Sequence, residues 1–367
     1  MNLTEKKYSK FALVREMMET PGIVRSFRPE SSIPFIPAFK RKKGLFLTGE
    51  GSSRLFPAKR AIFTNLRKEF LLPVLTEGCT QALEYNLKDF VIFAASNSGQ
   101  TKEVIRLVDS LKKKKHDTVF GLTANHGTKL EEFAHAAHVL KCGKENAVAA
   151  TKSVVEQGLF YDSLLRNLRG EKMAGLRKAA AQMEEVLTAK IDKKIIRMMH
   201  DAGMIWFAGR DNGVAAELAL KTNEITRKKS GFLEGTFALH GIEEVMNRGD
   251  VLIWVDPFEH DRDKFMECIV KGVGVNVIAI SDEKTDFPTV VIPDGGEYAE
   301  YLQLAAGWNL LVDTGIALGI DLDHPVRARK VGNEYVAAAQ AKGKKENTPV
   351  TAKRKKESAP VTATGKK

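Results

Sequence analysis

The chain has 367 residues, of which 43% are hydrophobic and 28% charged, a balance typical of a water-soluble protein with room for two domains. It has no apolar run near the roughly 20 residues that cross a bilayer, and its first residues lack the apolar core of a signal peptide. Cys79, Cys142 and Cys268 are far apart and have no metal-ligand spacing. We therefore expect reduced thiols in a cytoplasmic protein, and neither a membrane protein nor a disulfide-rich secreted one.

The net charge of +11 is concentrated at the C-terminal end of the sequence. Residues 342–367 hold nine basic and two acidic residues, a net charge of +7, which leaves about +4 for the rest of the chain. This stretch is low in complexity and has no aromatic residue, so we expect a disordered Lys-rich tail at residues 338–367. Such a tail can attract polyanions without specificity. It gives no reason to expect a specific nucleic-acid partner.

Helices and strands are expected to alternate from the N-terminus onward. Residues 1–27 form a helical segment, whose pattern from Phe11 to Phe27 is expected to be interrupted at Thr20-Pro21-Gly22. Apolar runs then predict strands at 44–48, 89–95, 118–123 and 136–140, with a helix beginning near Thr151.

Two turns rich in small hydroxyl residues follow strands of this first half. The turn Ser96-Asn97-Ser98-Gly99-Gln100-Thr101 lies between the strand at 89–95 and a predicted helix, where free N–H groups and the helix dipole favour an anion. The turn Gly49-Glu50-Gly51-Ser52-Ser53 follows the strand at 44–48. Both turns would lie at the carboxyl edge of one parallel sheet, where ligands bind. Each turn alone could be a simple helix cap, but the pair favours an anion site.

The same alternation begins again in the second half of the chain. One long helix is expected at about 176–201, and strands at 204–210, 251–255, 275–280 and 290–292. The predicted fold class is therefore α/β, with two tandem doubly wound αβα halves on parallel sheets, at residues 28–172 and 173–337. The second copy reads Asp256-Pro257-Phe258-Glu259-His260 after its second predicted strand, an acidic turn unfit to hold phosphate.

The second half carries titratable residues instead. Glu217, Lys221 and Glu224 are spaced i, i+4 and i+7, which places them on one face of a helix. This spacing also fits a surface salt-bridge ladder. A glycine-rich loop, Gly231–Gly241, follows and contains His240. A carboxylate and a histidine in one pocket can act as general base and general acid. No group of residues completes a metal site, so neither a metal nor another cofactor is expected.

These features resemble the SIS (sugar isomerase) superfamily, whose halves are flavodoxin-like. The closest resemblance is to the isomerase part of glucosamine-6-phosphate synthase and to free-standing relatives such as fructosamine-6-phosphate deglycases and glucosamine-6-phosphate deaminases. It covers about Phe11 to Val331 and includes the turn Ser96–Thr101, the paired halves and the interval from Glu224 to His240. Met18-Glu19-Thr20-Pro21 is similar to the family's E-x-P element, and Asp321–Val331 to its C-terminal D-x-D-x-P segment.

The resemblance implies a function and a role for each candidate residue. Glu224 would move a proton between C1 and C2 of a phosphosugar, His240 would assist ring opening, and Lys330 would lie near the carbonyl. His240 would reach across from a second subunit, which implies a homodimer with shared active sites. Glu217 and Lys221 would set the charge around Glu224. The residues implied to bind the phosphate are Ser52, Ser53, Ser96, Asn97, Ser98 and Thr101, supported by Gly51.

Two departures from the family leave the substrate open. The family's G-E-x-x-H-G-P pattern lacks its glutamate and its proline in the stretch Gly235–Glu244, and Ala150 stands where the synthase has a sugar-contacting serine. The sequence has no glutaminase domain, so we expect a free-standing isomerase, deaminase or deglycase acting on an amino sugar 6-phosphate or ketosamine 6-phosphate. The alternative is a non-catalytic phosphosugar sensor.

Overall fold

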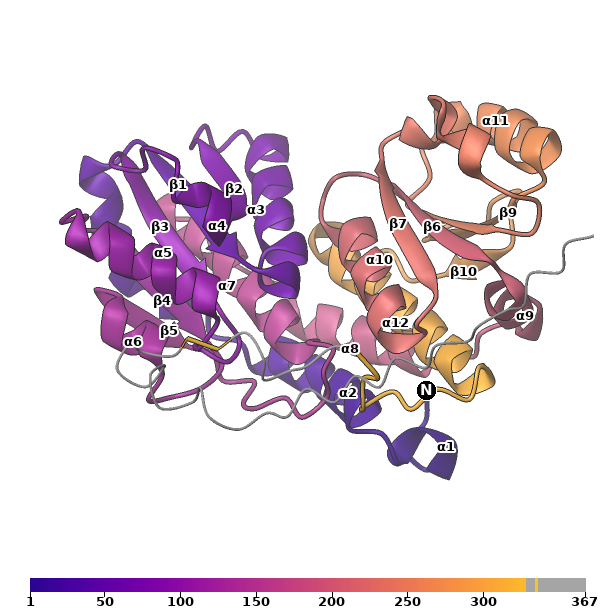
Figure 1. The fold of residues 1–367 in the computed structure, drawn as a ribbon, viewed down its shortest axis with the longest axis horizontal. Helices are drawn as coiled ribbons and strands as arrows, with labels where there is room; N and C mark the ends of the chain where they lie inside the picture. Colours follow the sequence, from indigo (N-terminus) through magenta and orange to yellow (C-terminus); the bar gives the residue numbers. More distant parts are fainter. Residues whose placement is uncertain (328–333, 336–367) are drawn as a thin grey trace, which may run out of the picture. The chain divides into compact units, whose positions relative to one another are not determined.

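Two five-stranded parallel sheets organise the chain, each covered by helices on both faces (Figure 1). The structure is a computed structural model that describes residues 1–327, 334 and 335, of which Met1–Glu334 belong to one compact unit. The predicted tail at 338–367 and the predicted residue Lys330 lie outside the described residues. No helix in the described part of the chain combines the length and the apolar character needed to cross a bilayer.

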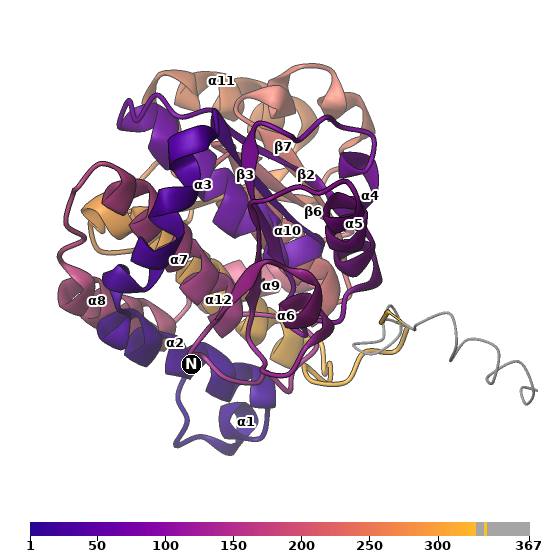
Figure 2. The same ribbon diagram turned by 90° about the vertical axis from the view of Figure 1, so that its left-hand side faces the viewer.

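The first sheet has the strand order β2-β1-β3-β4-β5, with every pairing parallel. Its strands are β1 (Gly44–Gly49), β2 (Val74–Gly78), β3 (Phe90–Ala95), β4 (Val119–Thr123) and β5 (Ala136–Val139). The helices between and after them are α3 (Leu55–Arg67), α4 (Cys79–Ala82), α5 (Lys102–Lys113), α6 (Lys129–Phe133) and α7 (Lys152–Leu168). Helices α3 and α5 lie on opposite faces of this sheet (Figure 2).

The second sheet repeats this order as β7-β6-β8-β9-β10, again with parallel pairings. Its strands are β6 (Met204–Gly209), β7 (Lys229–Glu234), β8 (Val251–Val255), β9 (Asn276–Ser281) and β10 (Thr289–Val291). The helices of this half are α8 (Leu176–Thr188), α9 (Lys193–Asp201), α10 (Val214–Ile225), α11 (Arg262–Phe265), a π-helix at Met266–Val273 and α12 (Ala299–Ala317). The predicted fold class, two tandem α/β halves on parallel sheets, is confirmed.

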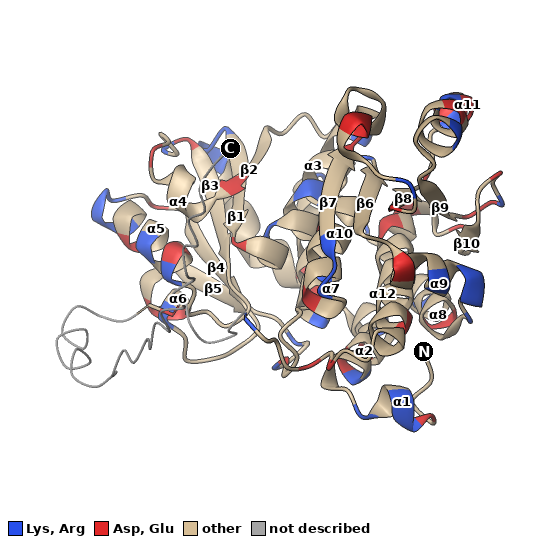
Figure 3. Cartoon of the chain, turned by 45° about the vertical axis from the view of Figure 1, so that its right-hand side comes forward, with Lys and Arg blue, Asp and Glu red and all other residues tan. Residues whose placement is uncertain are grey.

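The inner helices of the two halves pack against each other. A continuous hydrophobic core includes side chains of α2 (Ala12–Ser26), α7, α8, α10 and α12. The Phe56 ring on α3 meets the Tyr301 ring on α12 edge to face, with ring centroids 5.2 Å apart. Most of α12 is uncharged and buried, whereas outer helices such as α5 and α9 carry many of the charged residues (Figure 3).

The N-terminal segment contains a short helix, α1 (Lys6–Ser9), the longer α2 (Ala12–Ser26) and a 3₁₀ stretch at Pro29–Arg41. The expected interruption at Pro21 was wrong, since α2 continues through it. Pro21 has no N–H to donate to the carbonyl of Met17, but the Thr20 hydroxyl donates to that same oxygen at 2.5 Å. A neighbouring side chain therefore replaces the missing backbone donor.

Two other expectations about the elements were wrong. The single helix expected at 176–201 is two helices, because Ala189 leaves the helical conformation and Asp192 starts α9 by accepting a hydrogen bond from the Lys194 N–H at 2.8 Å. Strands β2 and β7 were not predicted, and β7 occupies part of the stretch interpreted as a glycine-rich loop. Both are edge strands that pair on one side only, β2 with β1 and β7 with β6.

Candidate active site

The two hydroxyl-rich turns lie where the first sheet reverses its strand order. The chain passes from β1 outward to β2 and returns to β3 on the other side of β1. In open α/β sheets, ligands bind at such a point, in the crevice beyond the carboxyl ends of the two strands. The turn at Gly51–Ser53 leads from β1 into α3, and the turn at Ser96–Thr101 leads from β3 into α5. Each turn therefore presents the N-terminus of a helix, of 13 and 12 residues, to this crevice.

The turn after β3 is held by its own hydroxyl groups. The Oγ of Ser96, which is buried, lies 2.7 Å from Thr101 Oγ1, and Ser98 Oγ accepts a hydrogen bond from the Gln100 N–H at 3.2 Å. Gly99 has φ +63°, and a Cβ at this position would lie 2.4 Å from the Thr128 side chain. Only glycine fits at this position without displacing the Thr128 side chain.

Asn97 has partners outside the crevice. Its side-chain amide donates to Ser153 Oγ at 2.6 Å and to the Glu145 carboxylate, and its backbone carbonyl accepts from Asn125 Nδ2 at 2.8 Å. Glu145 also accepts from the N–H groups of Thr151 and Lys152, at 2.7 and 2.9 Å, and so caps the start of α7. Asn97 thus connects the turn to α7. Its contact with phosphate remains a prediction.

The turn after β1 is joined to the second half of the chain. Ser52 is buried, and its Oγ accepts a hydrogen bond from the Lys221 ammonium at 2.7 Å. The Ser53 carbonyl accepts from Gln157 Nε2 of α7 at 2.6 Å, and Gly51 begins the turn with φ +54°. Sequence reasoning identified neither Gln157 nor Glu145 as a supporting residue. The Thr-Lys-Ser run that opens α7 was a signal that its N-terminus needs an acceptor.

Lys221 lies between two carboxylates on α10. Its Nζ is 2.7 Å from Glu224 Oε2 and 3.2 Å from Glu217 Oε1, so the predicted spacing does bring the three residues together. The side chains of Lys221 and Glu217 are 0% exposed, whereas that of Glu224 is 25% exposed. Glu224 is therefore the member of the group that solvent and a small ligand can reach.

Burial and charge act in opposite directions on this group. Burial alone would lower the pKa of Lys221, but the negative charges of Glu224 and Glu217 outweigh it and raise that pKa well above its usual value. Burial raises the pKa of Glu217, against the opposing effect of the Lys221 ammonium. Lys221 therefore remains a cation at neutral pH, in hydrogen-bond contact with Ser52 and Glu224.

The predicted His240 is not joined to this group. His240 is exposed and follows a 3₁₀ turn at Phe237–Leu239, and no hydrogen bond or ion pair of the described residues links it to Glu224. Lys330 lies outside the described residues. Glu334, which the structure does describe, forms an isolated antiparallel bridge with Thr101.

The equivalent edge of the second sheet is occupied by an ion pair. Arg210 follows β6 and Asp256 follows β8, and their charged groups are 2.5 Å apart, with the Arg210 guanidinium 4.4 Å from the Phe258 ring centroid. The cation that could attract a phosphate is thus engaged by a carboxylate. The two halves share a topology but not this site.

Residues 39–166, which contain both hydroxyl turns, match the family model described as "SIS domain". This part of the chain is similar to a SIS domain. The match ends within α7, and the second half repeats the strand order of the SIS domain. The resemblance inferred from the serine turns and the paired halves is confirmed.

Curated relatives include two archaeal proteins named glutamine–fructose-6-phosphate aminotransferase [isomerizing]. The one from Aeropyrum pernix is 25% identical over 264 residues, which cover 64% of this chain and 42% of the relative. The one from Sulfolobus acidocaldarius is 23% identical over 250 residues, which cover 65% of this chain and 41% of the relative. The aligned part of this chain therefore spans less than half the length of the curated relatives it matches.

Solved structures share the fold across both halves. Tagatose-6-phosphate ketose/aldose isomerase from Escherichia coli has a TM-score of 0.73 at 17% identity, covering 88% of this chain and 99% of that one. The C-terminal domain of glucosamine-fructose-6-phosphate aminotransferase from Francisella tularensis has a TM-score of 0.71 at 19% identity, covering 88% and 100%. Glucosamine-6-phosphate deaminase from Thermotoga maritima has a TM-score of 0.68 at 17% identity, covering 89% and 99%. At these identities the likeness concerns the fold.

Proposed function

We propose that this chain is an enzyme that isomerises a phosphosugar between aldose and ketose forms, with an amino sugar 6-phosphate or a ketosamine 6-phosphate as substrate. One contact carries the proposal above all others. The Lys221 ammonium touches Ser52 of the phosphate-binding turn on one side and Glu224 on the other, each at 2.7 Å. A sugar whose phosphate is held by the serine turns therefore has a partly exposed carboxylate beside it.

The hydroxyl turns would hold the phosphate. Ser52, Ser53, Ser96, Ser98 and Thr101 supply hydroxyl groups beside two helix N-termini, which together favour a dianion. Holding the phosphate fixes the sugar chain, so that C1 and C2 lie at a constant distance from the acid–base groups.

Glu224 would be the base that moves the proton. With glucosamine 6-phosphate it takes the proton from C2 of the open chain and returns it to C1, so that an enolamine becomes a C2 imine. Water then adds to the imine and releases ammonia and a ketose phosphate. With a ketosamine phosphate the proton moves from C1 to C2, and water releases the amine and an aldose phosphate. Lys221 would hold the carboxylate in place, and Lys330 would stabilise the developing oxyanion.

His240 would open the sugar ring from a neighbouring subunit. It is exposed, as a residue that completes another chain's site would be before assembly. The proposal therefore includes a homodimer. Mixing Glu224→Gln protein with His240→Ala protein tests it, because a mixed dimer holds one site with both residues intact. Random exchange between two inactive variants then recovers roughly a quarter of the wild-type rate if His240 acts across the dimer, and none if it acts within one chain.

The decisive experiment measures release of ammonia, amine and sugar phosphate from glucosamine 6-phosphate and from fructosamine 6-phosphate conjugates. Glu224→Gln should abolish turnover, while the control Glu185→Gln, on the exposed side of α8, should not. The substrate that is consumed distinguishes a deaminase from a deglycase. If the wild type turns over neither substrate yet binds phosphosugar, with or without the Glu224 carboxylate, the chain is a sensor and the proposal is wrong.

A further inference from the structure

A second charged cavity lies between the two halves, at the opposite ends of the helices that form the candidate active site. Its volume is about 300 Å³. Its charged lining comes from α3 and α7 of the first half and from the start of α12 in the second half. These residues are Arg60, Arg67, Lys68, Arg166, Glu297 and Glu300.

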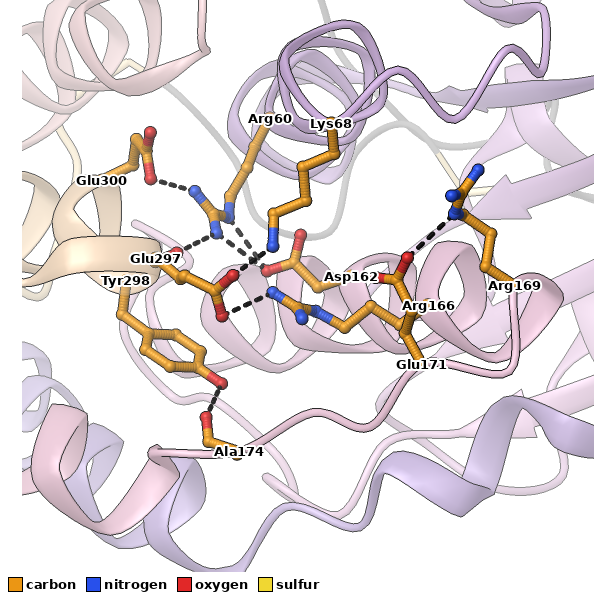
Figure 4. A network of polar contacts seen from close by, with 10 residues as sticks. All are labelled: Arg60, Lys68, Asp162, Arg166, Arg169, Glu171, Ala174, Glu297, Tyr298 and Glu300. Carbon is orange, nitrogen blue, oxygen red and sulfur yellow. Dashed lines mark hydrogen bonds and ion pairs between the residues drawn. The ribbon is translucent and has the colours of Figure 1, made fainter.

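Arg60 forms the fixed wall of this cavity. Its Nε is 3.0 Å from the Asp162 carboxylate, its Nη2 donates to the Glu297 carbonyl at 2.8 Å, and its Nη1 donates to Glu300 (Figure 4). Arg60 is 3% exposed. Each of its three guanidinium nitrogens already has an acceptor, so this residue holds the halves together.

Two of the other three cations share the Glu297 carboxylate. Arg166 donates from Nη2 to Glu297 at 2.9 Å, and the Lys68 ammonium pairs with the other oxygen of the same group (Figure 4). The Arg166 Nε is buried and has no hydrogen-bond partner among the residues that the structure describes. Arg67 lies over the Phe63 ring, with its guanidinium carbon 5.3 Å from the centroid, and forms no ion pair within the described part of the chain. The cavity therefore has more positive charge than Glu297 neutralises.

The Glu297 backbone is held by Arg60, so its half-exposed side chain is the part that can leave this place. Its side chain is 49% exposed, and it lies in the single 3₁₀ turn Gly296–Tyr298, with Gly295 before it and Gly296 at φ +51°. A carboxylate that is half in solvent can be exchanged for another anion at little cost.

We propose that this cavity binds a small phosphate, either inorganic phosphate or a phosphate monoester, which takes the place of the Glu297 carboxylate between Lys68 and Arg166. Phosphate presents more acceptor oxygens than a carboxylate and so reaches the unused Nε of Arg166 and the guanidinium of Arg67 as well. The site is separate from the hydroxyl turns, because the 13 residues of α3 span about 20 Å between them. It does not depend on the proposed isomerase activity.

Occupation of the cavity would also alter the contact between the halves. Lys68 and Arg166 belong to the first half and Glu297 to the second, so a bound phosphate replaces two ion pairs that join them. Helix α3 begins at the Ser52 turn, and α7 begins beside Ser153, which holds Asn97. Ligand bound where these helices end is therefore connected to the phosphate turns where they begin.

The test is a calorimetric titration of the full chain with inorganic phosphate at low ionic strength. It uses a Ser98→Ala/Thr101→Ala background, which removes hydroxyls from the first site and leaves the cavity intact. Glu297→Gln should tighten phosphate binding about tenfold, since it removes the competing carboxylate. Glu185→Gln, which makes the same change of net charge on α8, should leave the affinity unchanged. Arg67→Gln/Lys68→Gln should abolish binding, whereas the matched exposed pair Arg177→Gln/Lys178→Gln should not.

A gain of affinity in Glu297→Gln distinguishes a ligand site from a purely structural ion-pair cluster, which would only lose stability. The proposal is overturned if the background protein binds no phosphate, if Glu297→Gln and Glu185→Gln behave alike, or if both Arg-Lys pairs have the same effect. Turnover of a phosphosugar plays no part in these readouts, so they stand whether or not the chain proves to be an isomerase.

Discussion

Replacing Lys221 with methionine tests whether the group at the centre of the candidate active site is a buried ion cluster. Lys221 and Glu217 are both 0% exposed, so the substitution leaves the Glu217 carboxylate buried without its cation and removes the donor that Ser52 accepts. Breaking a buried ion pair by removing one partner costs about 3–5 kcal/mol. A domain is stable by only about 5–15 kcal/mol, so the loss should be large and easily measured.

The stability of Lys221→Met should also depend on pH in a defined direction. Burial already raises the pKa of Glu217, and the variant lacks the ammonium that opposes this shift. Above pH 4.5 the folded variant then keeps a proton that the unfolded chain releases. Its free energy of unfolding should therefore fall as the pH rises, by up to about 1.4 kcal/mol per pH unit, until Glu217 ionises in the folded state.

The assay is urea unfolding followed by far-UV circular dichroism at pH 5 and pH 8. Glu217→Gln/Lys221→Met, which removes both charges, should regain most of the stability at pH 8 and lose the pH dependence, although neither variant should be active. Lys190→Met, at an exposed lysine, is the control. A loss below about 1 kcal/mol at pH 8 for Lys221→Met, or the same loss at both pH values, would refute the assignment of a buried ion cluster.

Two further predictions concern the first half of the chain. Gly99→Ala should destabilise the protein by about 2 kcal/mol or more and weaken phosphate binding, because the new Cβ would lie 2.4 Å from Thr128 in a residue with φ +63°. Gly127→Ala, also at positive φ but with open space around its Cβ, should spare phosphate binding in the same titration. Burial lowers the pKa of His138 to about 4, below the value of about 6.5 in the unfolded chain, so its contribution to stability is complete above pH 6.5 and is lost as the pH falls toward 4. In urea unfolding, His138→Phe should remove about 2–3 kcal/mol of this pH dependence of the unfolding free energy. Replacing the exposed His126 with glutamine is the control and should leave the pH dependence unchanged. If His138→Phe and the wild type show the same pH dependence, His138 is not a buried neutral imidazole.

The elements that the sequence predicts well are those whose burial is uniform. The strands β1, β3, β6, β8 and β9 lie inside their sheets, so their residues form nearly unbroken apolar runs. The edge strand β2 reads Val-Leu-Thr-Glu-Gly with only its first residue buried, and such a mixed segment cannot be distinguished from a loop. The break between α8 and α9 could have been predicted from Asp192, because Asp is a favoured helix N-cap residue. No Gly or Pro, the residues that most often end a helix, lies at this break.

The candidate site could be predicted only as far as local spacing reaches. Three residues at i, i+4 and i+7 must share a face of a helix, and the contacts of Lys221 with Glu217 and Glu224 agree with this. The contact of Lys221 with Ser52, 169 positions away, follows from the packing of the two halves, which no local pattern reveals. The same holds for Asn97, whose amide is engaged by Glu145 and Ser153.

The repeated topology explains why the serine turn and the carboxylates meet. Helix α3 follows the first strand of its sheet and α10 follows the first strand of the other, so the two helices hold equivalent positions in the two halves. They approach closely at Gly213, just before α10, where a Cβ would lie 2.7 Å from the Leu55 carbonyl oxygen. The start of α3 is thereby brought to the side of α10. In the second half the Arg210–Asp256 ion pair occupies the equivalent edge of the sheet, while the contact between equivalent helices places Lys221 of this half beside the serine turn of the other.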